Sequence, residues 1–159
     1  MNKTQETKEK ICAFYASDYH FEMISLPYIN KQIEEDKQVI ILTENNLEKT
    51  IDTVISKINL KEEKKAKILN INWKNDDLSK IKEIKKAVED KKETTIFIKG
   101  KENYIKNINE NIEKWTKENG KIKLIDCYDL EEISDNLDNI MDKYNSVLGT
   151  TGKKQIEKI

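Results

Sequence analysis

Arginine is absent from this 159-residue sequence, and all 29 of its basic side chains are lysines. Without arginine, no guanidinium can hold a phosphate through paired hydrogen bonds. Glycine is also scarce, because the sequence has only four and the first is Gly100. The turn after the first predicted strand therefore lacks the glycines that let backbone amides approach a phosphate. Together these absences argue against a phosphoryl-transfer enzyme.

Histidine and cysteine are almost missing as well, with one histidine (His20) and two cysteines (Cys12 and Cys127) in the chain. Their spacing matches no zinc-binding motif, so we expect no metal site and no other cofactor. The sequence also offers no arrangement of nucleophile and base to which a catalytic role can be assigned.

Neither sign of charge dominates, since the net charge is −1 and lysines alternate with acidic residues, as in residues 61–65. This pattern favours solvated helix faces over direct contact with nucleic acid or a membrane surface. No apolar run approaches the roughly 20 residues of a membrane span, and the first ten residues lack the apolar core of a signal peptide. We therefore expect a cytoplasmic protein.

The apolar residues that are present predict five strands alternating with five helices. The expected strands cover residues 11–16, 39–43, 67–73, 94–99 and 122–128. The first helix carries Phe21 to Ile33, and the others cover residues 47–58, 78–89, 102–118 and 130–148. Pro27 lies either in the first turn of its helix, with Ser25 as the cap, or at a kink further along.

Several of these strands are continuous apolar runs, which is typical of parallel strands buried on both faces. The pattern predicts an α/β fold, a single three-layer α/β/α domain around a mostly parallel five-stranded sheet. The domain would cover residues 10–148, with flexible tails at residues 1–9 and 149–159.

Open parallel sheets bind ligands beyond the carboxyl ends of their strands. The residues expected there, apart from Lys99 and Gly100, are the candidate ligand-binding set: Tyr15, Ser17, Asp18, His20, Glu44, Trp73, Tyr128 and Asp129. Aromatic rings mixed with acids and one histidine suit a small organic ligand better than a triphosphate. Structural roles compete with this interpretation, because Asp18 is a typical helix N-cap, His20 a typical surface group beside it, and Trp73 a cover for an apolar edge.

Cys12 and Cys127 lie in the first and last predicted strands. Two buried thiols are the ordinary arrangement in a cytosolic protein. If the two strands are neighbours, however, the thiols would face each other as a redox pair.

Several short segments together resemble the MEDS domain, the sensory domain of methanogen, methylotroph and DcmR-type regulators. They are Lys10-Ile-Cys-Ala-Phe-Tyr15, Leu26-Pro-Tyr-Ile29, Val39-Ile-Ile-Leu-Thr-Glu44 and Leu124-Ile-Asp-Cys-Tyr-Asp129. The resemblance covers about residues 10–148, although the glycine usual before the second strand is missing near Asp36. It implies a RecA/KaiC-like fold without the Walker A motif, a small organic signal as ligand, and a histidine kinase or DNA-binding regulator as partner.

Three functions follow from these observations. The first is a non-catalytic sensory or regulatory domain that binds a small organic signal and acts in signal transduction or transcriptional control. The second is a partner-docking or homodimerising module with a vestigial pocket, which would use Trp115 and Tyr144. The third is a nucleotide hydrolase, which the missing phosphate-binding loop argues against.

Overall fold

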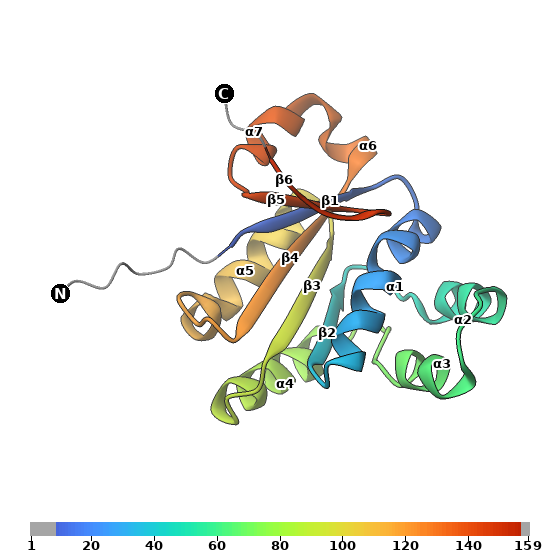
Figure 1. Ribbon diagram of the computed structural model, residues 1–159. Helices are drawn as coiled ribbons and strands as arrows, with labels where there is room; N and C mark the ends of the chain where they lie inside the picture. Colours follow the sequence, from blue (N-terminus) through green and yellow to red (C-terminus); the bar gives the residue numbers. More distant parts are fainter. Residues whose placement is uncertain (1–8, 157–159) are drawn as a thin grey trace.

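The computed structural model describes residues 9–156, which form one six-stranded sheet with helices on both faces (Figure 1). The strands are β1 (Ile11–Tyr15), β2 (Gln38–Thr43), β3 (Thr94–Gly100), β4 (Ile122–Asp129), β5 (Ser146–Gly149) and β6 (Gly152–Gln155). The helices are α1 (Asp18–Glu34), α2 (Glu48–Lys57), α3 (Glu62–Leu69), α4 (Asp77–Glu89), α5 (Glu102–Thr116), α6 (Leu130–Ile133) and α7 (Leu137–Met141), with the short 3-10 helix η1 (Ser134–Asn136) between the last two. The α/β fold class is confirmed, but the sheet has six strands where five were predicted.

The strand order is β2-β3-β4-β1-β5-β6, and all neighbouring pairs are parallel except β5 and β6. Along each strand successive side chains alternate between the two faces. Ile41 and Phe97 pack toward α1, α2 and α3, while Ile40 and Ile96 pack on the side of α4, α5 and α7. The two sides of the sheet therefore have separate hydrophobic cores.

The N-cap of helix α1 is Ser17, where Asp18 was expected. The helix therefore begins at Asp18, one residue earlier than predicted. Pro27 lies inside this helix, so the alternative with Ser25 as the cap is wrong. After the helix, Asp36 adopts a φ of 60°, the left-handed region that favours glycine. Aspartate tolerates this region better than most residues, which accounts for the absence of glycine before β2.

The predicted strand over residues 67–73 is wrong. Helix α3 extends to Leu69, and Trp73 lies in the loop that follows. Residues 62–67 consist of glutamate, lysine and alanine, all strong helix formers, and the helix continues through Ile68, which fills the core under α1. The apolar alternation from Ile68 to Trp73 therefore reflects burial against that core, without strand pairing.

The predicted helix over residues 130–148 is only partly present. It is interrupted at η1 and ends with α7, and residues 146–149 are instead strand β5. This strand pairs in parallel with β1, where Ile11 lies opposite Ser146 and Ala13 opposite Leu148. This pairing gives hydrogen-bond partners to the backbone groups along one edge of β1. Those groups would lack such partners if residues 146–149 were helical.

The expected C-terminal tail from residue 149 is also structured as far as the structure describes it. Strand β6 pairs with β5, and Ile156 packs at the edge of the core on the α5 side. Residues 1–8 and 157–159 of the two expected tails lie outside the described part of the chain. No described helix combines the length and apolar character needed to cross a membrane.

Candidate functional site

In the turn between β1 and α1, the backbone amides donate hydrogen bonds to acceptors within the turn itself. The Ser17 hydroxyl accepts from the His20 amide at 3.1 Å, and the His20 Nδ1 accepts from the Ala16 amide at 2.9 Å. The Phe21 amide donates to the Ser17 carbonyl at 2.9 Å. A phosphate at this turn would have to displace these bonds, since the same amides would be needed to bind it.

Asp18, Asn45 and Lys99 form a closed polar cluster beside this turn. The Lys99 Nζ lies 2.9 Å from Asp18 Oδ1 and donates to Asn45 Oδ1 at 2.8 Å. The Asn45 amide donates to Asp18 Oδ2 at 3.0 Å, which completes the triangle. Lys99 is only 2% exposed, and its ammonium lies 4.5 Å from the centre of the Tyr15 ring. The cluster neutralises a buried cation within the protein itself.

Tyr15 is buried next to this cluster. Burial raises the pKa of its phenol far above the ordinary value, with the negative charges of Asp129, Asp18 and Glu44 acting in the same direction. The phenol therefore stays protonated at every physiological pH.

Glu22, one turn along α1 from Asp18, is the exception among these polar groups. Its side chain is fully buried, and neither carboxylate oxygen has a hydrogen-bond partner among the described residues. Burial raises its pKa above the usual 4.5, with Asp18 adding to the effect and Lys99 and Thr50 opposing it. The Thr50 hydroxyl donates to the Leu47 carbonyl, so it does not satisfy the carboxylate.

Glu44 and Asp129 occupy the carboxyl ends of β2 and β4 as local capping groups. The Glu44 Oε1 accepts from the Lys101 amide at 2.9 Å, just before α5. A Cβ at Gly100 would lie 2.7 Å from Tyr104 Cδ2 and 2.8 Å from that oxygen, so a larger residue there would displace these two side chains. Asp129 caps α6 by accepting from the Glu131 amide at 3.1 Å. Both carboxylates thus have structural partners.

Trp73 does not lie at a strand end and is 2% exposed within the core on the α1 side. Its indole donates to the Ile68 carbonyl at 2.8 Å, and its own carbonyl accepts from the Leu47 amide at 2.9 Å. The structure therefore does not bring Trp73 together with the Asp18 cluster at an open edge.

Cys12 and Cys127 lie in the neighbouring strands β1 and β4, at register positions one residue apart. Because adjacent positions alternate in face, Cys127 packs in the core on the α1 side and Cys12 in the core on the α5 side. Burial raises the pKa of the Cys127 thiol well above its usual value. The structure does not bring the two sulfurs face to face as the redox hypothesis requires.

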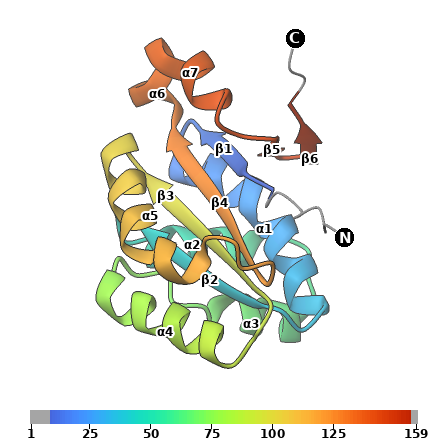
Figure 2. The ribbon, with the colours of Figure 1, turned by 90° about the vertical axis from the view of Figure 1, so that its left-hand side faces the viewer.

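An open groove of about 860 Å³ lies on the face of β4 that is turned toward α5. Figure 2 shows α5 along one side of β4 and the α6–α7 segment beyond its carboxyl end. The groove is lined by the start of β1, by one side of α5 and the turn after it, by Leu124, Asp126 and Tyr128 of β4, and by the segment after α7. Its volume lies within the range of roughly 300–1,000 Å³ that is usual for small-molecule sites.

Four residues of the groove form a hydrogen-bonded network on β4, α5 and the segment after α7. Tyr144 donates to Asp126 Oδ2 at 2.6 Å, and the Tyr128 and Tyr144 hydroxyl oxygens are 2.5 Å apart. The Asn109 amide donates to Asp126 Oδ1 at 3.2 Å. Burial raises the pKa of both tyrosines far above their ordinary value, so both remain protonated.

The groove combines apolar walls with a balanced charged rim. Ile11, Ile105 and Leu124 supply the apolar surface. The rim carries four lysines and four glutamates: Lys10, Lys106, Lys117, Lys143, Glu9, Glu102, Glu113 and Glu118. The rim therefore carries equal numbers of positive and negative side chains, and Asp126 lies on the floor of the groove.

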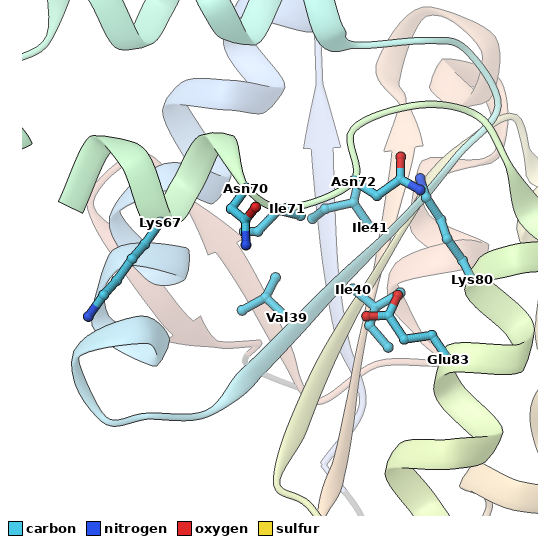
Figure 3. Close-up of a pocket in the computed structure, with 9 residues that line it drawn as sticks. All are labelled: Val39, Ile40, Ile41, Lys67, Asn70, Ile71, Asn72, Lys80 and Glu83. Atoms are coloured by element: carbon cyan, nitrogen blue, oxygen red, sulfur yellow. The ribbon is translucent and has the colours of Figure 1, made fainter. Parts of the chain in front are cut away.

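A second, smaller cavity of about 250 Å³ lies against the edge strand β2 (Figure 3). Lys80 and Glu83 of α4 line it opposite Asn70. Burial lowers the pKa of Lys80 to about 8, although the neighbouring Asp77, Asp76 and Glu83 oppose the shift. The Lys80 ammonium already donates to the Lys74 carbonyl. This cavity is smaller than most ligand sites, so we regard the groove as the candidate functional site.

Of the eight predicted ligand-binding residues, only Tyr128 lines the groove. Asp126 and Asn109 were not assigned to a site from the sequence, and Tyr144 was assigned only to the docking surface of the second hypothesis. One signal could have found Asp126, because a charged residue inside an apolar strand is rarely buried without a role. Nothing in the local sequence indicates that Tyr144 would meet it.

Comparison with protein-family models, with curated proteins and with solved structures found no match for this chain. Among the described residues, no group of three or more histidine, cysteine or acidic side chains is arranged to hold a metal ion.

Proposed function

We propose that this protein is a non-catalytic sensory or regulatory domain that binds a small organic molecule in the groove beside β4. The observation that carries this proposal is the groove itself, with about 860 Å³ of volume and a buried polar network on its floor. Apolar walls with a few fixed polar groups are the usual composition of a small-molecule site.

Nucleotide binding at the β1–α1 turn is disfavoured by two features of that turn. Its amides are already bound by the Ser17 and His20 side chains and by the Ser17 carbonyl. Lys99, the nearby cation, is buried and paired with Asp18, so it is not free to bind a phosphate. A phosphate would meet occupied donors and a carboxylate.

The resemblance to the MEDS domain extends the proposal to fold and partner. We infer a RecA/KaiC-like sheet, which is supported by the mostly parallel strands, the position of β1 between β4 and β5, and the glycine-free turn after β1. A histidine kinase or a DNA-binding regulator is the partner that the resemblance implies. The competing docking hypothesis is weakened because Tyr144, one of its two contact residues, is buried.

The test is a fragment screen of small aromatic and aliphatic compounds against the full chain, read from backbone amide resonances. We expect the resonances of β4, α5 and residues 143–144 to shift. Leu124→Trp should place an indole in the groove and reduce these shifts, because Leu124 lines it. The matched control is Leu78→Trp, since Leu78 is 77% exposed on α4 and lies outside the groove.

Shifts confined to Ser17–His20 would contradict the proposal and return the site to the carboxyl end of β1. Shifts of undiminished size in Leu124→Trp would contradict it as well. ATP turnover well above background by the purified chain would overturn the non-catalytic assignment.

A further inference from the structure

Helix α5 carries a stripe of alternating charges along the side that borders the groove. The stripe consists of Glu102, Lys106, Asn109, Glu113 and Lys117, the last of which directly follows the helix. These residues are spaced by three or four positions, which places them above one another on one side of a helix. Their charges follow the order negative, positive, negative, positive, with Asn109 in the middle.

The four charges of this stripe have no ionic partner within the described part of the chain. Lys106, Glu113 and Lys117 are exposed, and no ion pair among residues 9–156 involves them or Glu102. Glu102 and Lys106 are four residues apart, as are Glu113 and Lys117, yet neither couple forms an ion pair. The stripe therefore remains available to a partner.

The exposed residues of α5 that do not line the groove have a different composition. They are Asn103, Asn107 and Asn111, together with Glu110 and Lys114. Three of these five side chains are uncharged, so this surface carries no regular alternation of charge. The alternation belongs to the side of α5 that borders the groove.

The stripe is complementary to itself in one arrangement of two helices. When two copies of α5 pack antiparallel about a two-fold axis just after Asn109, Glu102 lies opposite Lys117 of the second copy. Lys106 then lies opposite Glu113 of the second copy. Because a two-fold axis repeats each contact, every charge of both stripes meets a charge of opposite sign.

Other arrangements of the same two helices bring like charges together. A parallel pair about a two-fold axis places each residue opposite its own copy, so that Glu113 faces Glu113. Sliding the antiparallel pair by four residues places Glu102 opposite Glu113 in one direction, or Lys106 opposite Lys117 in the other. Like charges in direct opposition are unfavourable. The sequence of the stripe thus selects one direction and one register.

We propose that the partner of this surface is a second copy of the chain, in a two-fold symmetric dimer whose α5 helices pack antiparallel along their charged stripes. Because the stripe also borders the groove, the second copy's helix lies along the mouth of each groove and shields its apolar wall at Leu124 from water. Exposed ion pairs contribute little individually, so the charges set direction and register more than affinity. The pairing does not require the buried Tyr144 to be exposed.

The test measures the oligomeric state of the full chain by analytical ultracentrifugation, for the wild type and for two charge reversals. Lys106→Glu places a glutamate opposite Glu113 of the second copy, and Glu113→Lys places a lysine opposite Lys106. We expect each variant alone to dimerise at least about thirtyfold more weakly than the wild type. Lys85→Glu is the matched control, since Lys85 is exposed on α4 and does not line the groove. It should dimerise as the wild type does.

An equimolar mixture of Lys106→Glu and Glu113→Lys gives the sharpest measurement. In a mixed dimer the introduced glutamate faces the introduced lysine, and the unchanged Glu113 of one chain faces the unchanged Lys106 of the other. We therefore expect the mixture to dimerise about as tightly as the wild type. General damage to either variant could not produce this recovery.

A wild type that stays monomeric at concentrations up to ~100 µM would overturn the inference. Dimerisation that neither reversal weakens would also overturn it, as would two weakened variants that do not associate when mixed. The small-molecule function proposed above is judged separately, by the fragment screen with Leu124→Trp.

Discussion

The two faces of the sheet each bury a polar cluster, and the clusters differ in the side chains that form them. On the α1 side, Lys99 is buried against Asp18 and Asn45, so a cation and an anion neutralise each other. On the α5 side, Asp126 accepts hydrogen bonds from Tyr144 and Asn109. This second cluster lines a cavity of ligand size.

This difference separates a structural cluster from a candidate binding site. A neutral, mutually bonded group such as the Lys99 cluster has little to offer a ligand and contributes mainly to the uniqueness and stability of the fold. The Asp126 network differs because it lines a groove of ligand size. Seven of the eight residues predicted from their places near strand ends lie outside that groove.

The largest expected effect comes from breaking the closed cluster. Lys99→Ala removes a buried side chain and leaves Asp18 without its cation, and we expect the free energy of unfolding to fall by about 3 kcal/mol. We place the value at the lower end of the usual range because the Asp18 side chain is 34% exposed and water can replace part of the loss. Urea denaturation measures the change.

The control for this prediction is Lys101→Ala, which removes an exposed lysine two residues away. It should change the free energy of unfolding by less than about 0.5 kcal/mol. An equally small effect of Lys99→Ala would mean that the buried ion pair does not stabilise the fold.

A smaller effect is expected from the network on the open face. Tyr144→Phe removes the hydroxyl that links Tyr128 to Asp126 and leaves the Tyr128 proton without its acceptor. Loss of such a buried partner should lower the free energy of unfolding by ~2 kcal/mol. Tyr19→Phe is the matched control, because Tyr19 is 61% exposed. Equal stability of the two variants would show that the network is not formed in solution.

The smallest effect concerns Glu22, the carboxylate that lies near the closed cluster but is not satisfied by it. Glu22→Met keeps the side-chain length and removes the unpartnered carboxyl group, so we expect a gain in stability of ~1 kcal/mol near neutral pH. Because burial raises the pKa of Glu22 in the folded state, the folded chain holds its proton after the unfolded chain has released it. Wild-type stability should therefore fall as the pH rises above about 4.5.

Glu22→Met should lack this part of the pH dependence, so its advantage over the wild type should grow as the pH increases from 4.5. Glu62→Met, at an exposed position on α3, is the control and should keep the wild-type pH dependence. A stability difference between wild type and Glu22→Met that does not change with pH would contradict the raised pKa.

Four of the five predicted strands are present in the structure. Runs such as Val39 to Leu42 are apolar at every position, which is typical of strands that are buried on both faces. Residues 67–73 and 146–149 were assigned wrongly for a common reason. A short apolar segment is compatible with helix or strand. Residues 146–149 paired with β1 as a strand, whereas residues 67–69 continued helix α3 and residues 70–73 lie unpaired near the edge strand β2.

The candidate site was predictable only in part. The residues at the strand ends were placed correctly for β1, β2 and β4, but sequence could not indicate that Asp18 would meet a lysine 81 positions away. Nor could it indicate that Tyr144 would leave its expected helix and reach Asp126. Such contacts depend on the order of strands in the sheet, to which local patterns are insensitive.

By itself, the sequence determined the α/β fold class, four buried strands and a turn after β1 without glycine, because the spacing of apolar residues and the choice of turn residues act locally. Only the tertiary structure decided which polar residues neutralise each other and which face a cavity. Those outcomes depend on hydrogen bonds and charges between elements far apart in the chain, whose energies are set by burial and distance.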